Sequence, residues 1–253
     1  MTEPVYAPVV AACRLWFAAA GMRVEVTGAQ HIPRTGGAVV ASNHVSYLDF
    51  IFAGLAGVHA HRYVRFMAKQ AVFDNPAAGP LMRGMKHIPV DRDAGSASFR
   101  TALSALRAGE VVGIFPEATI SRSFTVKDLK SGAVRLAQAS GTPLVPVAVW
   151  GGQRMLSKGV RRRLSRRRTH VLIAVGEPIP VPKGADGEAL AEVLRTCLQD
   201  MLTELQLRSR EQPRAGEDAW WHPAGLGGSA PTPEQAMALD DADRLARERR
   251  RSR

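Results

Sequence analysis

Short runs of β-branched and apolar residues alternate with helical patterns along most of the chain, and this alternation constrains the fold more than any other feature. The runs typical of buried strands cover residues 38–42, 64–68, 87–90, 111–115, 144–150 and 170–176. Helical patterns cover residues 46–58, 71–85, 96–108, 130–139 and 187–207. Parallel strands need long crossover connections, usually helices. The sequence therefore predicts a single α/β domain with a largely parallel mixed sheet flanked by helices.

The chain has 253 residues, and the predicted strands and helices of this sheet all lie within residues 23–213. That length suits one sizeable hydrophobic core, or at most two small domains. After Pro213 the composition changes, because residues 214–231 are rich in Gly, Pro and Ala and a charged helical pattern follows. We predict that residues 214–253 form a C-terminal appendage that is partly disordered and ordered in part at Trp220 and Trp221.

The N-terminal residues 5–22 are apolar, aromatic or small with the single exception of Arg14. Eighteen helical residues span about 27 Å, which is the lower limit for crossing a bilayer. Arg14 would add roughly 2.5–3.5 kcal/mol to the free energy of insertion. Residues 1–22 are therefore predicted to form a membrane-interface helix, with Trp16 and Phe17 among the headgroups and Arg14 reaching lipid phosphates. An ordinary core helix is the alternative.

Lys and Arg outnumber Asp and Glu by 34 to 23, which gives a formal charge of +11. Such a protein attracts nucleic acid, anionic lipid or phosphorylated substrates. The densest basic run consists of Lys158, Arg161, Arg162, Arg163, Arg166, Arg167 and Arg168. No nucleic-acid recognition motif or stacking aromatic accompanies the run, so an anionic membrane surface is the favoured partner and nucleic acid is not expected. A solvated loop, or a nonenzymatic basic binding module, remains open at this point.

The first candidate site follows the strand predicted at residues 38–42, where Asn43, His44 and Ser46 precede Asp49. A loop after a buried strand exposes its side chains at the carboxyl end of the sheet. A His that removes a proton needs a carboxylate on its other ring nitrogen, which holds the tautomer and stabilises the imidazolium. His44 and Asp49 are therefore a candidate catalytic pair. Because this spacing often arises by chance, an incidental pair is the alternative.

Three further segments end or follow predicted strands. Arg92 follows the strand at 87–90, Glu117 follows the strand at 111–115, and a Val-Pro-Val sequence lies within the strand at 144–150. Taken separately, each has a purely structural interpretation: a solvated Arg, the start of a helix and a buried strand.

Together with the His44 segment, these blocks resemble the glycerolipid acyltransferase family, and most closely its bacterial 1-acylglycerol-3-phosphate acyltransferases. That family carries Asn-His-x-x-x-x-Asp, a block ending in Arg, Phe-Pro-Glu-Gly-Thr-Arg and an apolar block centred on Val-Pro-Val. The corresponding segments occur here in the same order at residues 43–49, 84–92, 115–121 and 145–149. The resemblance covers about residues 20–205.

The resemblance implies an O-acyltransferase that moves a fatty acyl chain from acyl-CoA or acyl-carrier protein to the free hydroxyl of a lysophospholipid. The expected acceptor is 1-acylglycerol-3-phosphate, and the product is phosphatidic acid. His44 would be the general base and Asp49 would orient it, without a covalent acyl-enzyme, a cofactor or a metal. Together with the N-terminal helix and the basic run, this function leads us to expect a peripheral or monotopic protein at the cytoplasmic side of the cell membrane.

The substrate-binding residues that the resemblance implies are Asn43, Ser46, Arg92, Glu117, Thr119, Arg122 and Lys130. Residues 145–149 would contribute to the wall that contacts the acyl chain. The third block departs from the family pattern, with Ala118 for Gly and Ile120 for Arg. A missing Arg removes a phosphate-binding fork, which Arg122 or Lys130 would replace. Another lysophospholipid, or a lysoglycolipid, is the alternative acceptor.

Overall fold

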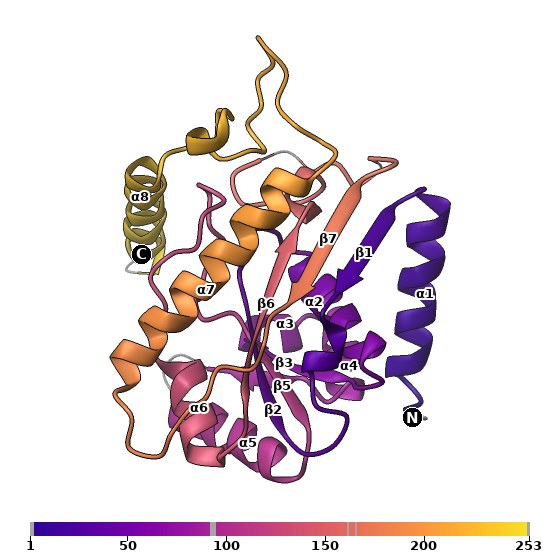
Figure 1. Ribbon diagram of the computed structural model, residues 1–253, viewed down its shortest axis with the longest axis vertical. Helices are drawn as coiled ribbons and strands as arrows, with labels where there is room; N and C mark the ends of the chain where they lie inside the picture. Colours follow the sequence, from indigo (N-terminus) through magenta and orange to yellow (C-terminus); the bar gives the residue numbers. More distant parts are fainter. Residues whose placement is uncertain (1–2, 92–94, 161, 165, 252–253) are drawn as a thin grey trace.

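The computed structural model describes residues 3–91, 95–160, 162–164 and 166–251, and its centre is a seven-stranded sheet with helices on both faces (Figure 1). The strands are β1 (Arg23–Thr27), β2 (Ala38–Ser42), β3 (Val64–Lys69), β4 (Ile88–Val90), β5 (Val111–Ile114), β6 (Leu144–Trp150) and β7 (His170–Val175). The α-helices are α1 (Tyr6–Ala19), α2 (Asp49–His59), α3 (Gln70–Phe73), α4 (Ala78–Gly84), α5 (Gly95–Arg107), α6 (Gly132–Ser140), α7 (Gly187–Arg208) and α8 (Pro233–Arg251). Short 3-10 helices occupy Ala29–His31, Gly152–Arg154 and Ala224–Leu226.

The strands lie in the order β1-β7-β6-β2-β5-β3-β4. Neighbouring strands are parallel except for β6 and β7, so β1 and β7 run opposite to the other five. The prediction of an α/β fold with a largely parallel mixed sheet is confirmed. Strand β1, a short strand of alternating polar and apolar residues, was not predicted from the sequence. Its partner β7 is far away along the chain, so local sequence carries little sign of the pairing.

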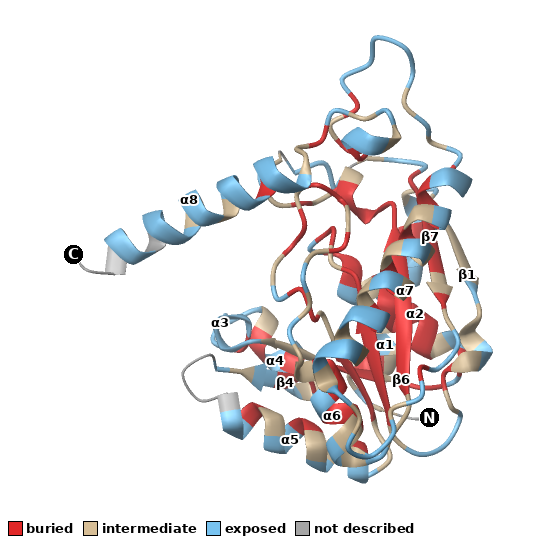
Figure 2. Ribbon diagram, turned by 60° about the vertical axis from the view of Figure 1, so that its left-hand side comes forward, coloured by how far each residue is buried: buried red, intermediate tan, exposed pale blue. Residues whose placement is uncertain are grey.

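Alternate strand residues contribute to two hydrophobic cores, one on each face of the sheet. Val39 and Ala41 pack in the core covered by α5, α6 and α7, whereas Ala38 and Val40 pack in the core covered by α1 and α2. This is the pattern expected of a strand buried on both faces. The central strands are accordingly buried along their length (Figure 2). Burial of this kind fixes where each strand ends, and therefore where the following loop begins.

The single helix predicted at residues 71–85 is wrong, because α3 and α4 are separate. The Asn75 side chain accepts hydrogen bonds from the N–H groups of Ala77 and Ala78, both at 3.0 Å. Pro76 follows Asn75 and disfavours helical geometry at the residue before it. A new helix therefore begins after Pro76.

Helix α1 contacts the second core with one side and solvent with the other. Phe17 is only 6% exposed and stacks on Phe52 at 5.8 Å between ring centroids, and the Tyr6 hydroxyl donates to the Val64 carbonyl at 3.0 Å. Phe17 is therefore a core residue, and its predicted position among lipid headgroups is wrong. Leu15 lies on the outward side and is 72% exposed. Within the described ranges, no helix has both the length and the apolar character needed to span a bilayer.

The C-terminal segment returns to the body of the protein before it leaves again as α8. Trp221 is buried in the first core, and the Arg154 guanidinium lies 3.7 Å from its ring centroid. Helix α8 extends away from the body and is exposed along most of its length (Figure 2). The division into residues 1–22, 23–213 and 214–253 stays a prediction, but Phe17 and Trp221 share the cores of the sheet.

Candidate active site

The loops after β2, β5 and β6 meet at the carboxyl edge of the parallel strands. The Ser121 N–H donates to the His44 carbonyl at 2.7 Å, and the Ser157 hydroxyl donates to the Val45 carbonyl at 2.7 Å. Gly152 lets the loop after β6 lie close to Ser46 and Phe52, because a Cβ there would lie 2.9 Å from the Phe52 ring and 3.1 Å from Ser46 Oγ. The His44 loop is thus held from both sides by neighbouring loops, as ligand sites in open α/β sheets commonly are.

His44 and Asp49 form the pair that the sequence predicts. His44 Nδ1 lies 3.0 Å from Asp49 Oδ2, which also accepts the N–H groups of Val45 and Ser46, each at 2.7 Å. Burial raises the pKa of Asp49, against the opposing effect of the hydrogen bonds from His44, Ser46 and Val45. Within the described residues, nothing bonds to the other ring nitrogen, Nε2. Because Asp49 accepts a hydrogen bond from Nδ1–H, the lone pair lies on Nε2, which is free to take a proton.

Asn43 and Ser46 are fully buried and hold the loop. The Asn43 side chain donates to the Val149 carbonyl at 3.0 Å and accepts the Val149 N–H at 2.7 Å. The Ser46 hydroxyl donates to the Leu156 carbonyl at 2.7 Å and accepts the Leu48 N–H at 3.0 Å. In this conformation both residues position His44, and neither presents a surface to a substrate.

Glu117 joins the His44 loop to the loop after β5. Its two carboxyl oxygens accept the N–H groups of His44 at 2.7 Å and Lys127 at 3.1 Å. Burial, aided by the nearby Asp49, raises the pKa of Glu117 to about 8 and outweighs these hydrogen bonds. A largely neutral Glu117 at pH 7 places little second negative charge beside Asp49.

One side of the site is apolar. The His44 ring stacks on Phe115 with 4.3 Å between centroids, and Phe115 stacks on Phe66 at 5.7 Å. Phe66 in turn lines a narrow cavity of about 50 Å³ between α1 and α2. Single Phe residues in the sequence do not reveal that these rings form a row. Residues 145–149, expected to contact the acyl chain, lie wholly inside the sheet and its cores.

The other side of the site is polar. Lys127 Nζ donates to Thr119 Oγ1 at 2.9 Å, and Arg122 follows Ser121, which contacts His44. Lys130 is exposed, and its N–H donates to the Pro116 carbonyl at 2.9 Å. Thr119 and Arg122 thus lie in the loop that contacts His44 through Ser121, and Lys127, which the prediction from the sequence did not include, contacts Thr119. The presence of Lys127 in the loop after Glu117 was the sequence feature that could have indicated this contact. Arg92 lies outside the described residues.

These features define a class of protein. An α/β sheet presents a buried Asp, a His with an open Nε2, an apolar wall and a group of cations at one edge. The arrangement can remove a proton from a hydroxyl while holding an anionic group nearby.

Comparisons with known proteins assign the chain more narrowly. Residues 23–150, which contain all four blocks, match the family model described as acyltransferase. A 1-acyl-sn-glycerol-3-phosphate acyltransferase of Bacillus subtilis (strain 168) is 33% identical over 160 residues, covering 62% of this chain and 73% of that protein. The alpha form of 1-acyl-sn-glycerol-3-phosphate acyltransferase from Bos taurus is 32% identical over 213 residues, covering 82% and 71%.

A crystal structure of the 1-acyl-sn-glycerophosphate acyltransferase from Thermotoga maritima aligns with a TM-score of 0.68 at 23% identity and covers 81% of each chain. That similarity supports the fold. The chain belongs to the acyltransferase family and is an enzyme of the 1-acylglycerol-3-phosphate O-acyltransferase-like class. The resemblance inferred from the four blocks is confirmed, and a nonenzymatic binding module is no longer the competing interpretation.

The departures at 118 and 120 have structural consequences. Ala118 has φ +59°, in the left-handed region where glycine carries no steric penalty. Ile120 is buried, so its side chain belongs to the interior and adds nothing to a charged surface.

Ala118→Gly should stabilise the protein by about 1 kcal/mol, because relief of left-handed strain exceeds the entropy that a new glycine adds to the unfolded chain. Urea unfolding of the purified variant measures this change. Ala97→Gly, at an exposed position in α5, is the matched control and should destabilise by about 0.5–1 kcal/mol. Equal destabilisation by both substitutions would contradict the strain at Ala118.

Proposed function

We propose that this acyltransferase moves a fatty acyl chain from acyl-CoA or acyl-carrier protein to the free hydroxyl of 1-acylglycerol-3-phosphate and forms phosphatidic acid. The carrying observation is the His44–Asp49 pair with its open Nε2, in a member of the acyltransferase family. The acceptor is supported by the relatives, since bacterial and mammalian matches alike are named for 1-acyl-sn-glycerol-3-phosphate. No cofactor or metal is part of the proposal.

In the proposed reaction, His44 Nε2 takes the proton of the acceptor hydroxyl as its oxygen attacks the thioester carbonyl carbon. The new C–O bond forms, the C–S bond breaks, and the imidazolium returns the proton to the leaving thiolate. Asp49 stabilises the imidazolium through Nδ1. The Phe115 ring, which is partly buried and stacks on His44, suits the acyl chain, and the cations near Thr119 suit the acceptor phosphate.

An acceptor panel tests this proposal. Purified protein with oleoyl-CoA should acylate 1-acylglycerol-3-phosphate with a kcat/KM at least about tenfold above lysophosphatidylcholine or a lysoglycolipid, because phosphate monoesters pair with several cations at once. Mass spectrometry of the products measures the transfer. A preference for a lysoglycolipid would replace the acceptor while keeping the chemistry, and no transfer to any lysolipid would refute the proposal.

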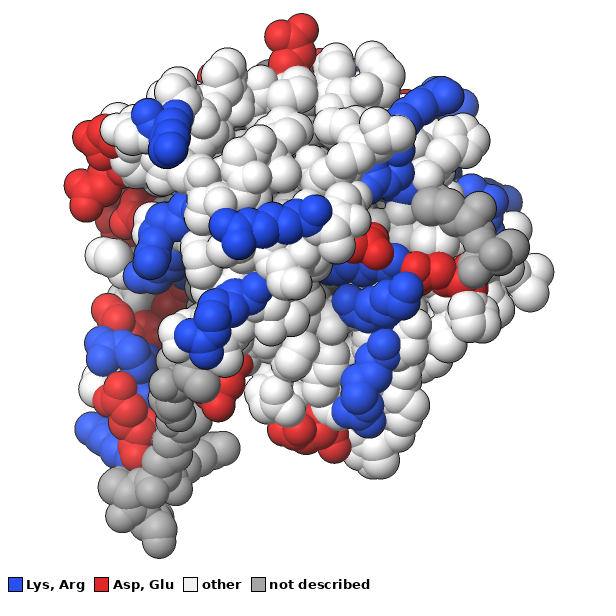
Figure 3. Space-filling view, turned by 90° about the horizontal axis from the view of Figure 1, so that it is seen from below, with Lys and Arg blue, Asp and Glu red and all other residues white. Residues whose placement is uncertain are grey.

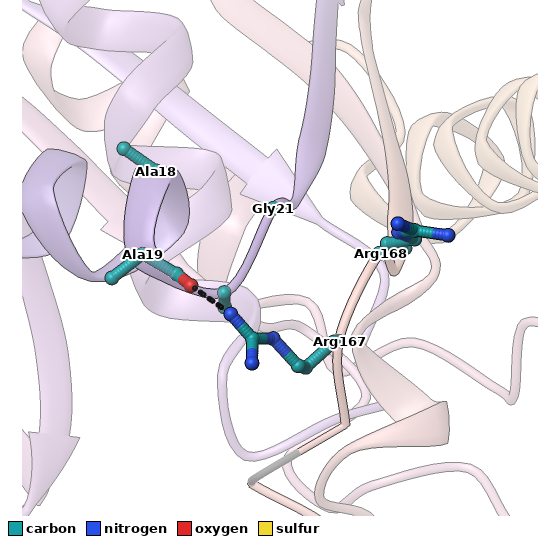
Figure 4. Close-up of a pocket in the computed structure, with 6 residues that line it drawn as sticks. Ala18, Ala19, Gly21, Arg167 and Arg168 are labelled. Atoms are coloured by element: carbon teal, nitrogen blue, oxygen red, sulfur yellow. Dashed lines mark hydrogen bonds between the residues drawn. The ribbon is translucent and has the colours of Figure 1, made fainter.

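We also propose that the enzyme works at the cytoplasmic face of the membrane as a peripheral or monotopic protein. The outward side of α1 combines Leu15 with exposed alanines, and its end adjoins the basic run. The Arg168 N–H donates to the Ala20 carbonyl at 2.9 Å, and the Arg167 guanidinium reaches the Ala19 carbonyl at 3.3 Å (Figure 4). An apolar helix face beside exposed arginines suits an anionic interface.

Only part of the basic run is available for such binding. Lys158 pairs with α8, Arg166 lies 3.3 Å from Glu211, and Arg161 is outside the described residues. The exposed members are Arg162, Arg163, Arg167 and Arg168. On the face seen from below, Lys and Arg are interspersed with Asp and Glu and do not form one continuous patch (Figure 3). The local surface around α1 therefore carries the proposal better than the overall charge does.

Leu15→Asp should weaken sedimentation with vesicles containing anionic lipid by about tenfold, since it places a charge on the outward side of α1. Deleting the helix is a poor test because Tyr6 and Phe17 belong to the core. Leu207→Asp on α7, where the native leucine is 62% exposed, is the matched control and should bind like the wild type. Unchanged sedimentation of Leu15→Asp would overturn the membrane role of α1.

A further inference from the structure

Two carboxylates of α8 form ion pairs with cations from the loops that contact the His44 loop. Asp240 accepts Lys127 Nζ at 2.5 Å and also pairs with Lys158, and it lies 3.4 Å from Arg122 Nε. Asp243 accepts Arg122 Nη2 at 2.7 Å and lies 3.2 Å from Lys158 Nζ. The cluster is largely sheltered, since the Arg122, Lys158 and Asp240 side chains are 14%, 17% and 18% exposed. We call Arg122, Lys127 and Lys158 the cation cluster.

Each member of the cation cluster is connected to the His44 loop by a hydrogen bond of its own backbone or of the residue before it. Arg122 follows Ser121, whose N–H donates to the His44 carbonyl. The Lys127 N–H donates to Glu117, which also binds the His44 N–H. Lys158 follows Ser157, whose hydroxyl donates to the Val45 carbonyl. The cluster therefore borders the loop that carries the base, although it comes from two separate segments of the chain.

We propose that the cation cluster is a binding site for a phosphate monoester, and that α8 fills this site with Asp240 and Asp243 until the ligand displaces them. The inference rests on the proposed function, because the phosphate belongs to the lysophospholipid acceptor. Three converging cations suit the charge of about two on a phosphate monoester. A pair of carboxylates supplies the same charge within the chain.

Other features support the proposal that a phosphate ligand can displace the α8 carboxylates. Buried Ile120 stands where the family pattern has an Arg, so this chain needs another source of positive charge. Burial raises the pKa of Asp240, but the hydrogen bonds from Lys127 and Lys158 outweigh it and the net pKa is lowered. The hydrogen bonds from Arg122 and Lys158 also lower the pKa of Asp243. Both carboxylates are therefore ionised at neutral pH and compete with phosphate. Beyond the buried Ala236, most of α8 is exposed (Figure 2), so few apolar contacts oppose its displacement.

The test measures binding by titration calorimetry without an acyl donor, so it does not depend on turnover. The probe is 1-hexanoylglycerol-3-phosphate, and 1-hexanoylglycerol is the control that lacks phosphate. The double variant Asp240→Asn/Asp243→Asn should bind the phosphorylated probe at least about tenfold more tightly than the wild type. Asp241→Asn removes the same kind of charge from α8 at a residue that pairs with Arg244, and it should bind like the wild type.

Further arms identify the source of the phosphate and the role of the cluster. Inorganic phosphate, like the probe, should bind the double variant more tightly than the wild type. CoA and dephospho-CoA should bind the double variant with equal affinity. Adding Lys158→Gln to the double variant should reverse the gain. Hydrogen exchange of residues 234–246 in the wild type should accelerate when the probe saturates it. If the double variant does not fold, the single variant Asp243→Asn replaces it and should show a smaller gain in affinity for the probe.

Unchanged affinity for the phosphorylated probe, or an equal gain for 1-hexanoylglycerol, would overturn the phosphate site. If the affinities follow the expected pattern but no acyl transfer to 1-acylglycerol-3-phosphate occurs, the proposed function fails and the site stands. If transfer occurs but neither carboxylate variant alters binding, only the site proposal fails. If the double variant, unlike the wild type, binds CoA more tightly than dephospho-CoA, the cation cluster binds the acyl donor. That result would overturn its assignment to the acceptor phosphate.

Discussion

His44→Ala should reduce acyl transfer from oleoyl-CoA by at least about 10³-fold while the protein remains folded. General base catalysis contributes typically 10²–10⁴-fold, and His44 Nε2 is the base that this site offers. The side chain is 19% exposed and contacts Asp49 and Phe115, so its removal leaves the two cores in place. Initial rates at saturating acceptor, together with a thermal melt, measure both parts of the prediction.

His59→Ala is the matched control for this experiment. His59 lies in the last turn of α2, is exposed, and makes a local hydrogen bond from Nδ1 to the Leu55 carbonyl at 2.9 Å. Its substitution should leave the rate within about twofold of the wild type, as for surface substitutions generally. A fully active His44→Ala variant would exclude His44 from the mechanism.

Asp49→Asn should lower kcat by about 10²- to 10⁴-fold with a smaller effect on the KM of the acceptor. The geometry allows this substitution to remove the charge of Asp49 while its three hydrogen bonds are kept. Oδ2 accepts all three hydrogen bonds, whereas Oδ1 is buried without a hydrogen-bond partner among the described residues. An Asn can therefore keep its carbonyl oxygen towards His44 and place its amide nitrogen where Oδ1 lies. What it removes is the negative charge that stabilises the imidazolium.

Asp49→Ala separates this charge from the positioning of the ring. Alanine leaves the N–H groups of Val45 and Ser46 without their acceptor, and each such buried group costs about 1–3 kcal/mol. We expect Asp49→Ala to lose stability as well as rate, whereas Asp49→Asn loses mainly rate. Normal kcat in Asp49→Asn would show that the carboxylate charge has no part in catalysis.

Much of the fold could be predicted because it depends on local patterns. The β-branched runs at residues 38–42 and 144–150 coincide with β2 and β6, since strands buried on both faces must be apolar throughout. Strand β1 and the break between α3 and α4 were missed. The first depends on pairing with a distant strand, and the second on the turn at Asn75 and Pro76, where the short Asn75 side chain accepts backbone hydrogen bonds.

The candidate site divides in the same way. His44 and Asp49 lie within six residues, so their contact could be predicted from the sequence and the expected loop. Lys127 could not be distinguished from Lys130 by spacing, because the path of an irregular loop decides which ammonium reaches Thr119. The contact of Lys158 with Asp240 joins segments that are far apart along the chain, and no local signal carried it.

By itself, the sequence determined the sheet, the family and the His44–Asp49 pair, because these follow from local hydrophobic periodicity and from short, ordered blocks. Only the tertiary structure decided that Phe17 belongs to the core and that Asp240 of α8 pairs with Lys127 and Lys158. It also decided that Asn43 and Ser46 support the loop. Burial and ion pairing between distant segments depend on the packed chain, so residue types and spacings alone could not reveal them.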